Sequence, residues 1–350
     1  MPRALSGFSP KPPPALPLTR PLRACLGGLI LGALMTPLAP AIAAAEDAIP
    51  EPLSLDQALT YAAGHPRVRL GTAAADLPRS PPLYLDCERL AFSHLDSEDS
   101  RSRPSVVLLA PLPAQHLEIM ARFLDVLLAD LSYARYNEAM AVAYIQYDRA
   151  NIRRELGQYA ELRVAELETA YQDVLRKRAA SETSQRLTRD LLAQAMGRPG
   201  ELPSDLTPPQ LTLPPDELPN LDAVMAQAAE QAWPHPPAIA SDPALAKDYR
   251  RLLDMELRRQ ALELLSRLNI LKTSARYAES EAFMRDLKLD ESRTLYEQEV
   301  KADLGYSMSQ QTMARLHEDQ VRYCRALGWA ELNALQGRSL LSEPEVETTP

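Results

Sequence analysis

Proline is missing from two long stretches of this chain, although the 350 residues include 31 prolines. The stretches cover residues 114–198 and 244–343, and they are rich in Ala, Leu, Glu, Arg and Gln, which are strong helix formers. Aromatic residues are also scarce, at 5% of the chain. Few aromatics and many aliphatics suit long helices packed along seams better than a sandwich or an α/β enzyme. We therefore expect an all-α protein.

Sequence patterns typical of enzymes are absent as well. No His-Glu-x-x-His or Glu-x-x-His pair occurs, so zinc-peptidase and di-iron sites lack their ligands. His116 and Glu118 match the opening of a zinc-deaminase signature, but no Pro-Cys-x-x-Cys follows. There is no Gly-x-Ser-x-Gly, P-loop or dinucleotide fingerprint, and the acidic cluster 96–99 lacks calcium-loop spacing. We expect no catalytic residue, no cofactor and no metal. The five histidines are His65, His94, His116, His235 and His317.

The chain also lacks an excess of basic residues. Its formal charge is −9, and residues 1–45 hold four basic side chains and no acidic one. The remainder carries 34 basic against 47 acidic residues, a net charge of −13. Because phosphate binding requires a basic stripe, we expect no nucleic-acid partner.

Residues 1–45 have the pattern of a secretory signal peptide. Basic residues up to Arg23 precede an apolar run at 24–35, and small residues follow at 41–45 before the first acidic pair. Twelve apolar residues are too few for a stable membrane anchor. Export would leave Cys87 and Cys324 in an oxidising compartment, where they could form a disulfide or remain as two separate buried thiols.

Each proline-free stretch contains a Leu-Gly pair near its middle. Glycine inside a helix costs about 1 kcal/mol relative to alanine, so Gly157 and Gly305 are better explained as turns between two helices. The chain then consists of two long helical hairpins in tandem. In the first, Met120, Leu124, Leu127, Leu131 and Ala134 repeat at spacings of three and four, as do Ala160, Val164, Leu167, Tyr171 and Val174. Such stripes predict a coiled-coil-like seam.

Composition divides the chain into six segments. Two short sequences recur, since Leu55-Asp56 and Leu221-Asp222 are each followed by Ala-Ala and then by His-Pro, at His65 and His235. This indicates an imperfect tandem duplication. The segments are a signal peptide (1–45), a short helix and loop (46–113), the first hairpin (114–198), a proline-rich linker with a short helix (199–243), the second hairpin (244–341) and a disordered tail (342–350).

The signal peptide, the repeated Leu-Asp helix openings and the Leu-Gly hairpins together resemble the TolC family of outer membrane efflux proteins. The linker sequence 191–203 is also similar to that family's mid-chain connector. The resemblance covers roughly residues 53–337. It implies an outer membrane or periplasmic location, a homotrimer, and a tripartite efflux system with a periplasmic adaptor and an inner-membrane transporter. The expected docking tips are Leu156, Gly157, Gln158, Leu304, Gly305 and Tyr306.

The sequence departs from the family where membrane strands are expected. A spanning strand requires roughly 9–11 residues of alternating polarity, whereas residues 262–292 follow a helical period and residues 106–110 are too short. We therefore expect little or no β-barrel. Two hypotheses follow from this departure. The chain is either a TolC-like efflux component or a periplasmic helical scaffold, similar to an adaptor, that has lost channel activity.

Overall fold

The computed structural model describes residues 48–74, 77, 79–92, 108–231, 242–298 and 304–342, and these lie in one compact unit, residues 48–350. The described residues form helices and loops and no β-strand, as the composition predicts. The one bridge of strand type among them joins Leu53 to Leu206. The predicted signal peptide and the predicted tail after Ser342, together with His94 and His235, lie outside the described residues.

The N-terminal part folds into short helical segments, and both α1 and α2 begin with a side-chain cap. Ser54 caps α1 in a reciprocal capping box with Gln57. His65 caps α2, and Pro66 takes the first helical position, where its missing N–H costs nothing. These elements are α1 (Leu55–Thr60), η1 (Tyr61–Gly64), α2 (Pro66–Leu70), η2 (Gly71–Ala74) and, after a loop, α3 (Cys87–Phe92). Helix α3 was not anticipated.

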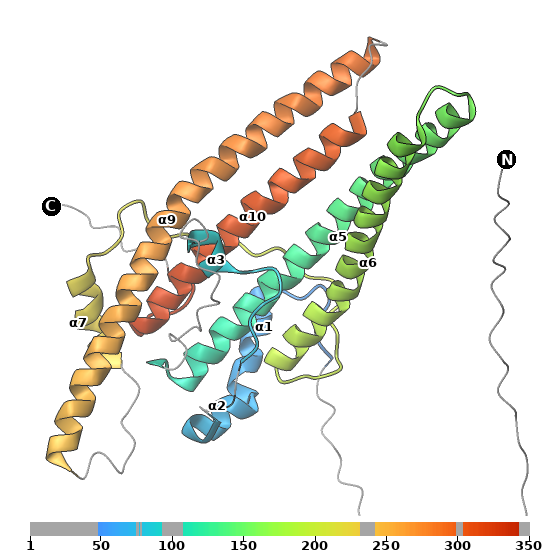
Figure 1. Ribbon diagram of the computed structural model, residues 1–350. Coiled ribbons are helices and arrows are strands. Elements are labelled where there is room, and N and C mark those ends of the chain that lie inside the picture. Colours follow the sequence, from blue (N-terminus) through green and yellow to red (C-terminus); the bar gives the residue numbers. More distant parts are fainter. Residues whose placement is uncertain are drawn as a thin grey trace, which may run out of the picture. The chain divides into compact units, whose positions relative to one another are not determined.

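The first hairpin consists of α5 (Pro111–Glu155) and α6 (Glu161–Ala195), which pack against each other along their length (Figure 1). Helix α5 begins three residues before the predicted start, because Pro111 and Pro113 lie in a first turn that tolerates proline.

The second hairpin follows the linker and the short helix α7 (Leu221–Gln231). Its outgoing helix, α9 (Pro243–Glu297), has 55 residues and extends about 80 Å. The return helix, α10 (Leu304–Leu335), packs on both α9 and α5. Helix α1 contacts α5, and α7 contacts α9, so each half places its short helix on its outgoing arm. This arrangement agrees with the duplication read from the sequence.

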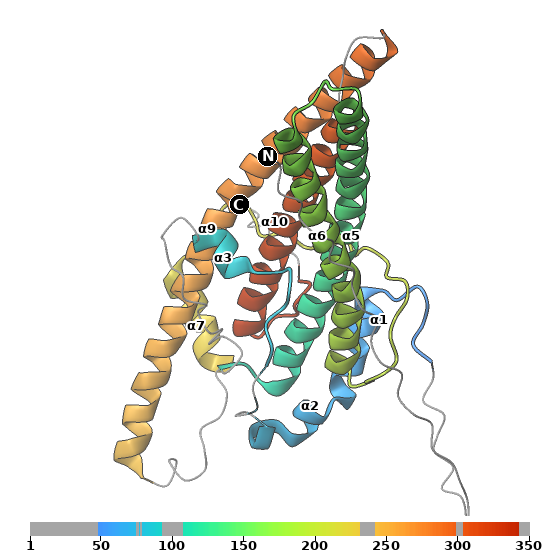
Figure 2. The ribbon, with the colours of Figure 1, turned by 45° about the vertical axis from the view of Figure 1, so that its right-hand side comes forward.

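The hydrophobic core lies where the first half of α5, the middle of α9 and the second half of α10 meet (Figures 1 and 2). Gly328 permits this close packing, since a Cβ there would lie 3.0 Å from Leu268 Cδ2. Fully buried large side chains of the core include Ile119, Met120, Phe123, Leu124, Leu128, Leu257, Leu268 and Leu271.

The predicted seam of the first hairpin is correct only in part. Met120, Leu124 and Leu127 are buried, but Ala134 is exposed. Beyond the core the contact between α5 and α6 is mixed: Ala150 and Val164 are buried, and polar and aromatic residues also meet. Arg178 bonds Tyr133 at 3.0 Å and Asn137 at 3.2 Å, and the rings of Tyr147 and Tyr171 stack at 5.9 Å. The predicted stripe therefore fails at Ala134 on α5, whereas Val164 of the stripe on α6 is buried as predicted.

A loop at 79–86 and α3 together form a strap, residues 79–92, which contacts both hairpins. Asp125 of α5 is fully buried and accepts hydrogen bonds from the backbone N–H groups of Leu83, Tyr84 and Leu85 at 2.6–3.0 Å. Arg122, one turn away, donates to the carbonyls of Ser80 and Pro81. These two side chains supply hydrogen-bond partners for backbone N–H and C=O groups of the loop part of the strap, which has no helix or strand of its own.

The strap is fixed to the second hairpin by the disulfide Cys87–Cys324, which joins α3 to α10 across 237 positions of sequence. Both cysteines are buried. Next to it, Arg267 of α9 pairs with Glu331 of α10 and lies 3.9 Å from Glu88 of the strap. Of the two alternatives left open by the sequence, the disulfide is the one observed.

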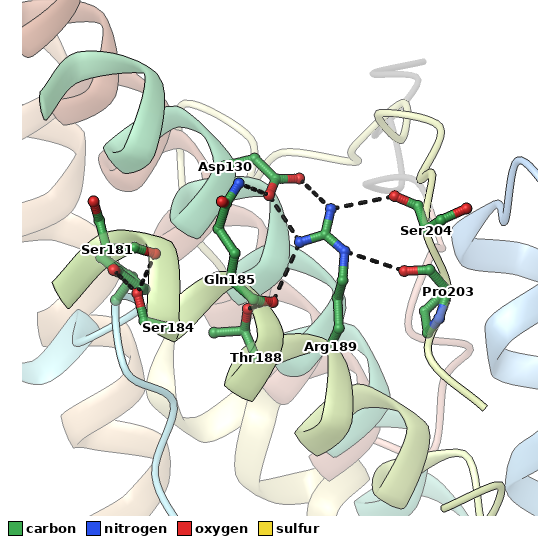
Figure 3. Close-up of polar contacts among 9 residues, drawn as sticks. Asp130, Ser181, Ser184, Gln185, Thr188, Arg189, Pro203 and Ser204 are labelled. Carbon is green, nitrogen blue, oxygen red and sulfur yellow. Dashed lines mark hydrogen bonds and ion pairs between the residues drawn. The ribbon is translucent and has the colours of Figure 1, made fainter. Parts of the chain in front are cut away.

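The linker is attached to the first hairpin by a second polar cluster, shown in Figure 3. The guanidinium of Arg189 makes two hydrogen bonds to Asp130, at 2.8 and 2.9 Å, and donates to the carbonyls of Pro203 and Ser204. Gln185 donates to the same carboxylate. The linker then pairs with the N-terminal segment, since the N–H of Leu53 bonds the carbonyl of Asp205 at 2.9 Å.

Candidate functional site: the ends of the helical hairpins

The first hairpin reverses at residues 156–160, as the Leu-Gly pair predicts. Gly157 has φ +69°, and its N–H bonds the carbonyl of Arg154, while the N–H of Gln158 bonds that of Arg153, both at 2.8 Å. This is a Schellman motif, which satisfies the last carbonyls of α5 and needs a left-handed residue at the glycine position. Gly157 is thus explained by local backbone geometry.

The surface of this reversal is apolar with a charged border. Leu156 is 67% exposed and Leu162 is 72% exposed, and Ile152 is exposed beside them. Arg153 donates to the hydroxyl of Tyr159 at 2.8 Å, and Arg154 lies 3.3 Å from Glu161. Exposed leucines at a rigid turn give a partner apolar area to bury, and the surrounding charges are available for orientation.

The second reversal lies between Gln298 and Leu304, and residues 299–303 are outside the described part of the chain. The turn was predicted at Leu304-Gly305, and this placement was wrong by a few residues. Leu304, Gly305 and Tyr306 form the first turn of α10. A glycine is tolerated there because the first four N–H groups of a helix have no partner within the helix. Tyr306 is 52% exposed, so this helix end also presents a large side chain to solvent.

Both reversals lie at the same end of the two hairpins. Thr312, near the start of α10, bonds Glu138 in the second half of α5 at 2.6 Å, and Arg135 donates to the sulfur of Met313 at 3.0 Å. The start of α10 therefore faces the later part of α5, and Figures 1 and 2 show the two tips together at one end. The structure thus brings the six predicted tip residues to one end of the hairpins.

The histidines that are described have structural surroundings. His65 Nδ1 accepts from the N–H of Arg67 and its Nε2 lies 3.2 Å from the carbonyl of Gln194, so the ring connects α2 to the end of α6. Burial lowers the pKa of His65 and that of His116. His317 lies 3.5 Å from Glu281. Among the described residues, no three His, Cys, Asp or Glu side chains gather in a way that could hold a metal ion.

Sequence reasoning missed the strap and its anchors. The available signal was Arg122 and Asp125, two charged residues three positions apart inside an otherwise apolar run. Charged residues are almost never fully buried without partners, so this pair could have indicated a polar segment crossing α5. The partners themselves lie some forty residues earlier in the chain and could not be read from local pattern.

No family model matches the sequence, and no curated protein matches it. Among solved structures, the chain is similar to CusC, a protein studied for the conformational changes that accompany folding and transmembrane channel formation. The match has a TM-score of 0.52 and 11% identity, and covers 82% of this chain and 96% of that one. VceC of Vibrio cholerae matches 66% of this chain with a TM-score of 0.41, and MtrE of Neisseria gonorrhoeae matches 83% with 0.39. Identities are 11% and 12%, and the matches cover 71% and 91% of those chains. These two scores are too low to carry an argument.

The hairpins, their paired reversals and the match to CusC define the fold, which is that of a TolC-like outer membrane efflux channel. At 11% identity this likeness concerns the fold alone. One difference is that residues 262–292, where the resemblance implies strands, lie in the unbroken helix α9. Within the described residues, no helix is both long and apolar enough to cross a bilayer.

Proposed function

We propose that this protein is an exported component of a tripartite efflux system, located in the periplasm or at the outer membrane. Its two hairpin tips would dock on a periplasmic adaptor that connects to an inner-membrane transporter, and a homotrimer is its expected assembled form. The observation that carries the proposal is the pair of tandem hairpins whose reversals lie at one end. The function would depend on helix contacts and would involve no covalent chemistry.

A photo-crosslinking amino acid at Leu156 tests the docking role in the producing cell. We expect adducts with an adaptor or transporter at this position, identified by mass spectrometry. Leu187 is the matched control, because it is a leucine that is also exposed but lies in the last third of α6, away from the tip. Equal labelling from both positions, or no adduct other than with the chain itself, would remove the docking proposal.

A second candidate function is a periplasmic scaffold that retains the helices without transport. The unbroken helix through residues 262–292 favours it, since those residues supply no strand. Deletion and fractionation separate the two candidates. Increased sensitivity to toxic compounds on deletion, with recovery of the protein in the outer membrane pellet, supports efflux. Unchanged sensitivity and recovery in the soluble periplasmic fraction support the scaffold.

A further inference from the structure

The strap, residues 79–92, contacts all four long helices of the protein. On the first hairpin, Asp125 of α5 accepts hydrogen bonds from three backbone N–H groups of the strap at 2.6–3.0 Å. The hydroxyl group of Tyr84 bonds that of Ser184 in α6. On the second hairpin, the side-chain amide of Gln320 in α10 donates to the carbonyl of Tyr84 at 2.8 Å. The loop part of the strap therefore already lies across both hairpins.

Helix α3 is the part of the strap that packs on the second hairpin (Figures 1 and 2). Cys87 at its start is bonded to Cys324 of α10. The carboxylate of Glu88 lies 3.9 Å from the guanidinium of Arg267, which is already paired within the second hairpin. Leu90 packs on a small apolar cluster of α9 and α10, formed by Ala275, Ala278 and Val321.

The strap crosses the helices where the hydrophobic core ends and the arms begin. We define the arms as the parts of the two hairpins between the strap and the tips. The continuous buried run of α5 ends at Ala129, four residues beyond Asp125. In the arms, α5 and α10 are connected by polar contacts such as the bond of Thr312 to Glu138. The strap therefore joins the two hairpins at the level from which the arms extend.

The attachment of α3 to the second hairpin depends on the disulfide. A helix of six residues is too short to be stable by itself. Without the covalent bond, α3 would be retained by the apolar contacts of Leu90 and Ala91 and by one carboxylate near a cation that has another partner. We therefore expect α3 to open locally much more often when the two thiols are reduced.

The disulfide also has to form late. Cys324 lies 237 positions after Cys87, in α10, so the two thiols are present together only when nearly the whole chain has been made. Both cysteines are buried in the folded protein. An oxidant therefore reaches them before α3 is in place or while α3 is open. Thiols stay reduced in the cytosol, whereas an exported chain meets disulfide oxidants.

We propose that Cys87–Cys324 is a latch that closes after export and fixes the separation of the two arms. The two thiols lose two protons and two electrons as the S–S bond forms, and the disulfide of a protein oxidant takes them up and becomes a dithiol. Closure holds α3 on the second hairpin. While the latch is open, α3 leaves α9 and α10, and the arms adopt a wider range of separations. The latch rests on the exported location proposed above, but it needs neither an adaptor nor a transporter.

Spin labels carried by noncanonical amino acids at Leu162 and Tyr296 measure the separation of the arms, because both side chains are exposed and lie near the two tips. Double electron–electron resonance should give a narrow distance distribution for the oxidised protein and a broader one for Cys87→Ala/Cys324→Ala. Hydrogen exchange of the backbone amides of α3 should be at least about tenfold faster in that variant. Reduction of the unaltered protein should reproduce both changes, and reoxidation should reverse them, so the test does not depend on the folding of one variant.

The matched control is Leu257→Ala, which removes a buried core side chain of α9 ten residues before Arg267. It lowers the stability of the whole protein but should keep the narrow distance distribution. Equal broadening in this control, or an unchanged distribution in Cys87→Ala/Cys324→Ala, would overturn the proposal. Recovery of the protein with two free thiols from the producing cell would also overturn it. Failure of the crosslinking at Leu156 would remove the docking role and leave the latch intact, so the two proposals fail separately.

Discussion

The two halves of α5 form one continuous helix, yet they lie in different surroundings. Residues 114–129 are nearly all buried, because α10, the strap and the N-terminal helices cover the sides that α6 leaves open. Beyond Ser132, Ala150 is the one buried residue of the helix, and tyrosines, arginines and carboxylates make the contacts to α6. The first half of α5 therefore belongs to the hydrophobic core, which determines stability. The second half belongs to the arm of the hairpin, where more of the helix surface is open to solvent. The experiments below test this division.

The largest expected difference is between two phenylalanines. Phe123 lies in the core with no exposed surface, whereas Phe283 on the α9 arm is 66% exposed. Phe123→Ala should lower the free energy of unfolding by about 3–5 kcal/mol, through lost burial and the cavity left behind. Phe283→Ala should change it by less than about 0.5 kcal/mol. Urea unfolding measures both, and similar losses would contradict the division between core and arms.

Removing the disulfide should produce the next largest effect. Cys324→Ser opens a link that joins α3 to α10 across 237 positions, so the unfolded chain gains freedom, and we expect a loss of about 2–4 kcal/mol. The measurement is urea unfolding of the variant beside the oxidised protein, with and without a dithiol reductant. The reductant should destabilise only the unaltered protein. If the variant and the oxidised protein unfold at the same urea concentration, the strap does not depend on this bond.

The polar anchor of the strap gives the third comparison. Burial raises the pKa of Asp125 although three backbone N–H groups favour its charged form. Asp125→Ala would leave those buried donors without an acceptor, and we expect a loss of about 1–3 kcal/mol. Asp130→Ala, in the more exposed cluster with Arg189, should cost about 1 kcal/mol or less. Thermal unfolding distinguishes the two, and a larger effect at Asp130 would place the main anchor at the linker.

Substitution of two glycines should give smaller losses of stability. The two positions can be compared directly, because both glycines occupy the left-handed position of a Schellman motif. Gly157 at the tip has φ +69° and no atom within 4 Å of an added Cβ, whereas Gly197 at the base has φ +77° and His65 Cδ2 at 3.2 Å. Gly157→Ala should cost about 1 kcal/mol from backbone strain. Gly197→Ala should cost more, since His65 must also move. Equal losses in urea unfolding would show that the packing at Gly197 adds nothing.

The smallest effect is a pH dependence at the base. Burial lowers the pKa of His65 below its ordinary value of 6.5, so the folded protein binds this proton less readily than the unfolded chain does. The stabilising contribution of His65 to the folded protein is present above pH 6.5. It is lost as the pH falls through 6.5 toward the folded-state pKa. His65→Gln should reduce the loss of stability between about pH 7 and pH 5. An unchanged slope in that variant would assign the dependence to other groups, with His116 the first to test.

Local pattern predicted much of the fold. The absence of proline predicted the four long helices, Gly157 marked a reversal, and the repeated Leu-Asp helix openings predicted the matching places of α1 and α7. It failed where distant segments decide the contacts. The seam at Ala134, the turn at Gly305 and the strap on Arg122 and Asp125 are the clearest cases.

What the sequence determined by itself is helix identity, length and reversal, because propensity, capping and glycine geometry act over fewer than ten residues. Only the tertiary structure decided which face of each helix is buried, how Cys87 and Cys324 pair, and which side of α9 stays open. These depend on segments that lie far apart in the chain. The packing contacts between these segments form only when the whole core is assembled, so a local sequence pattern cannot predict them.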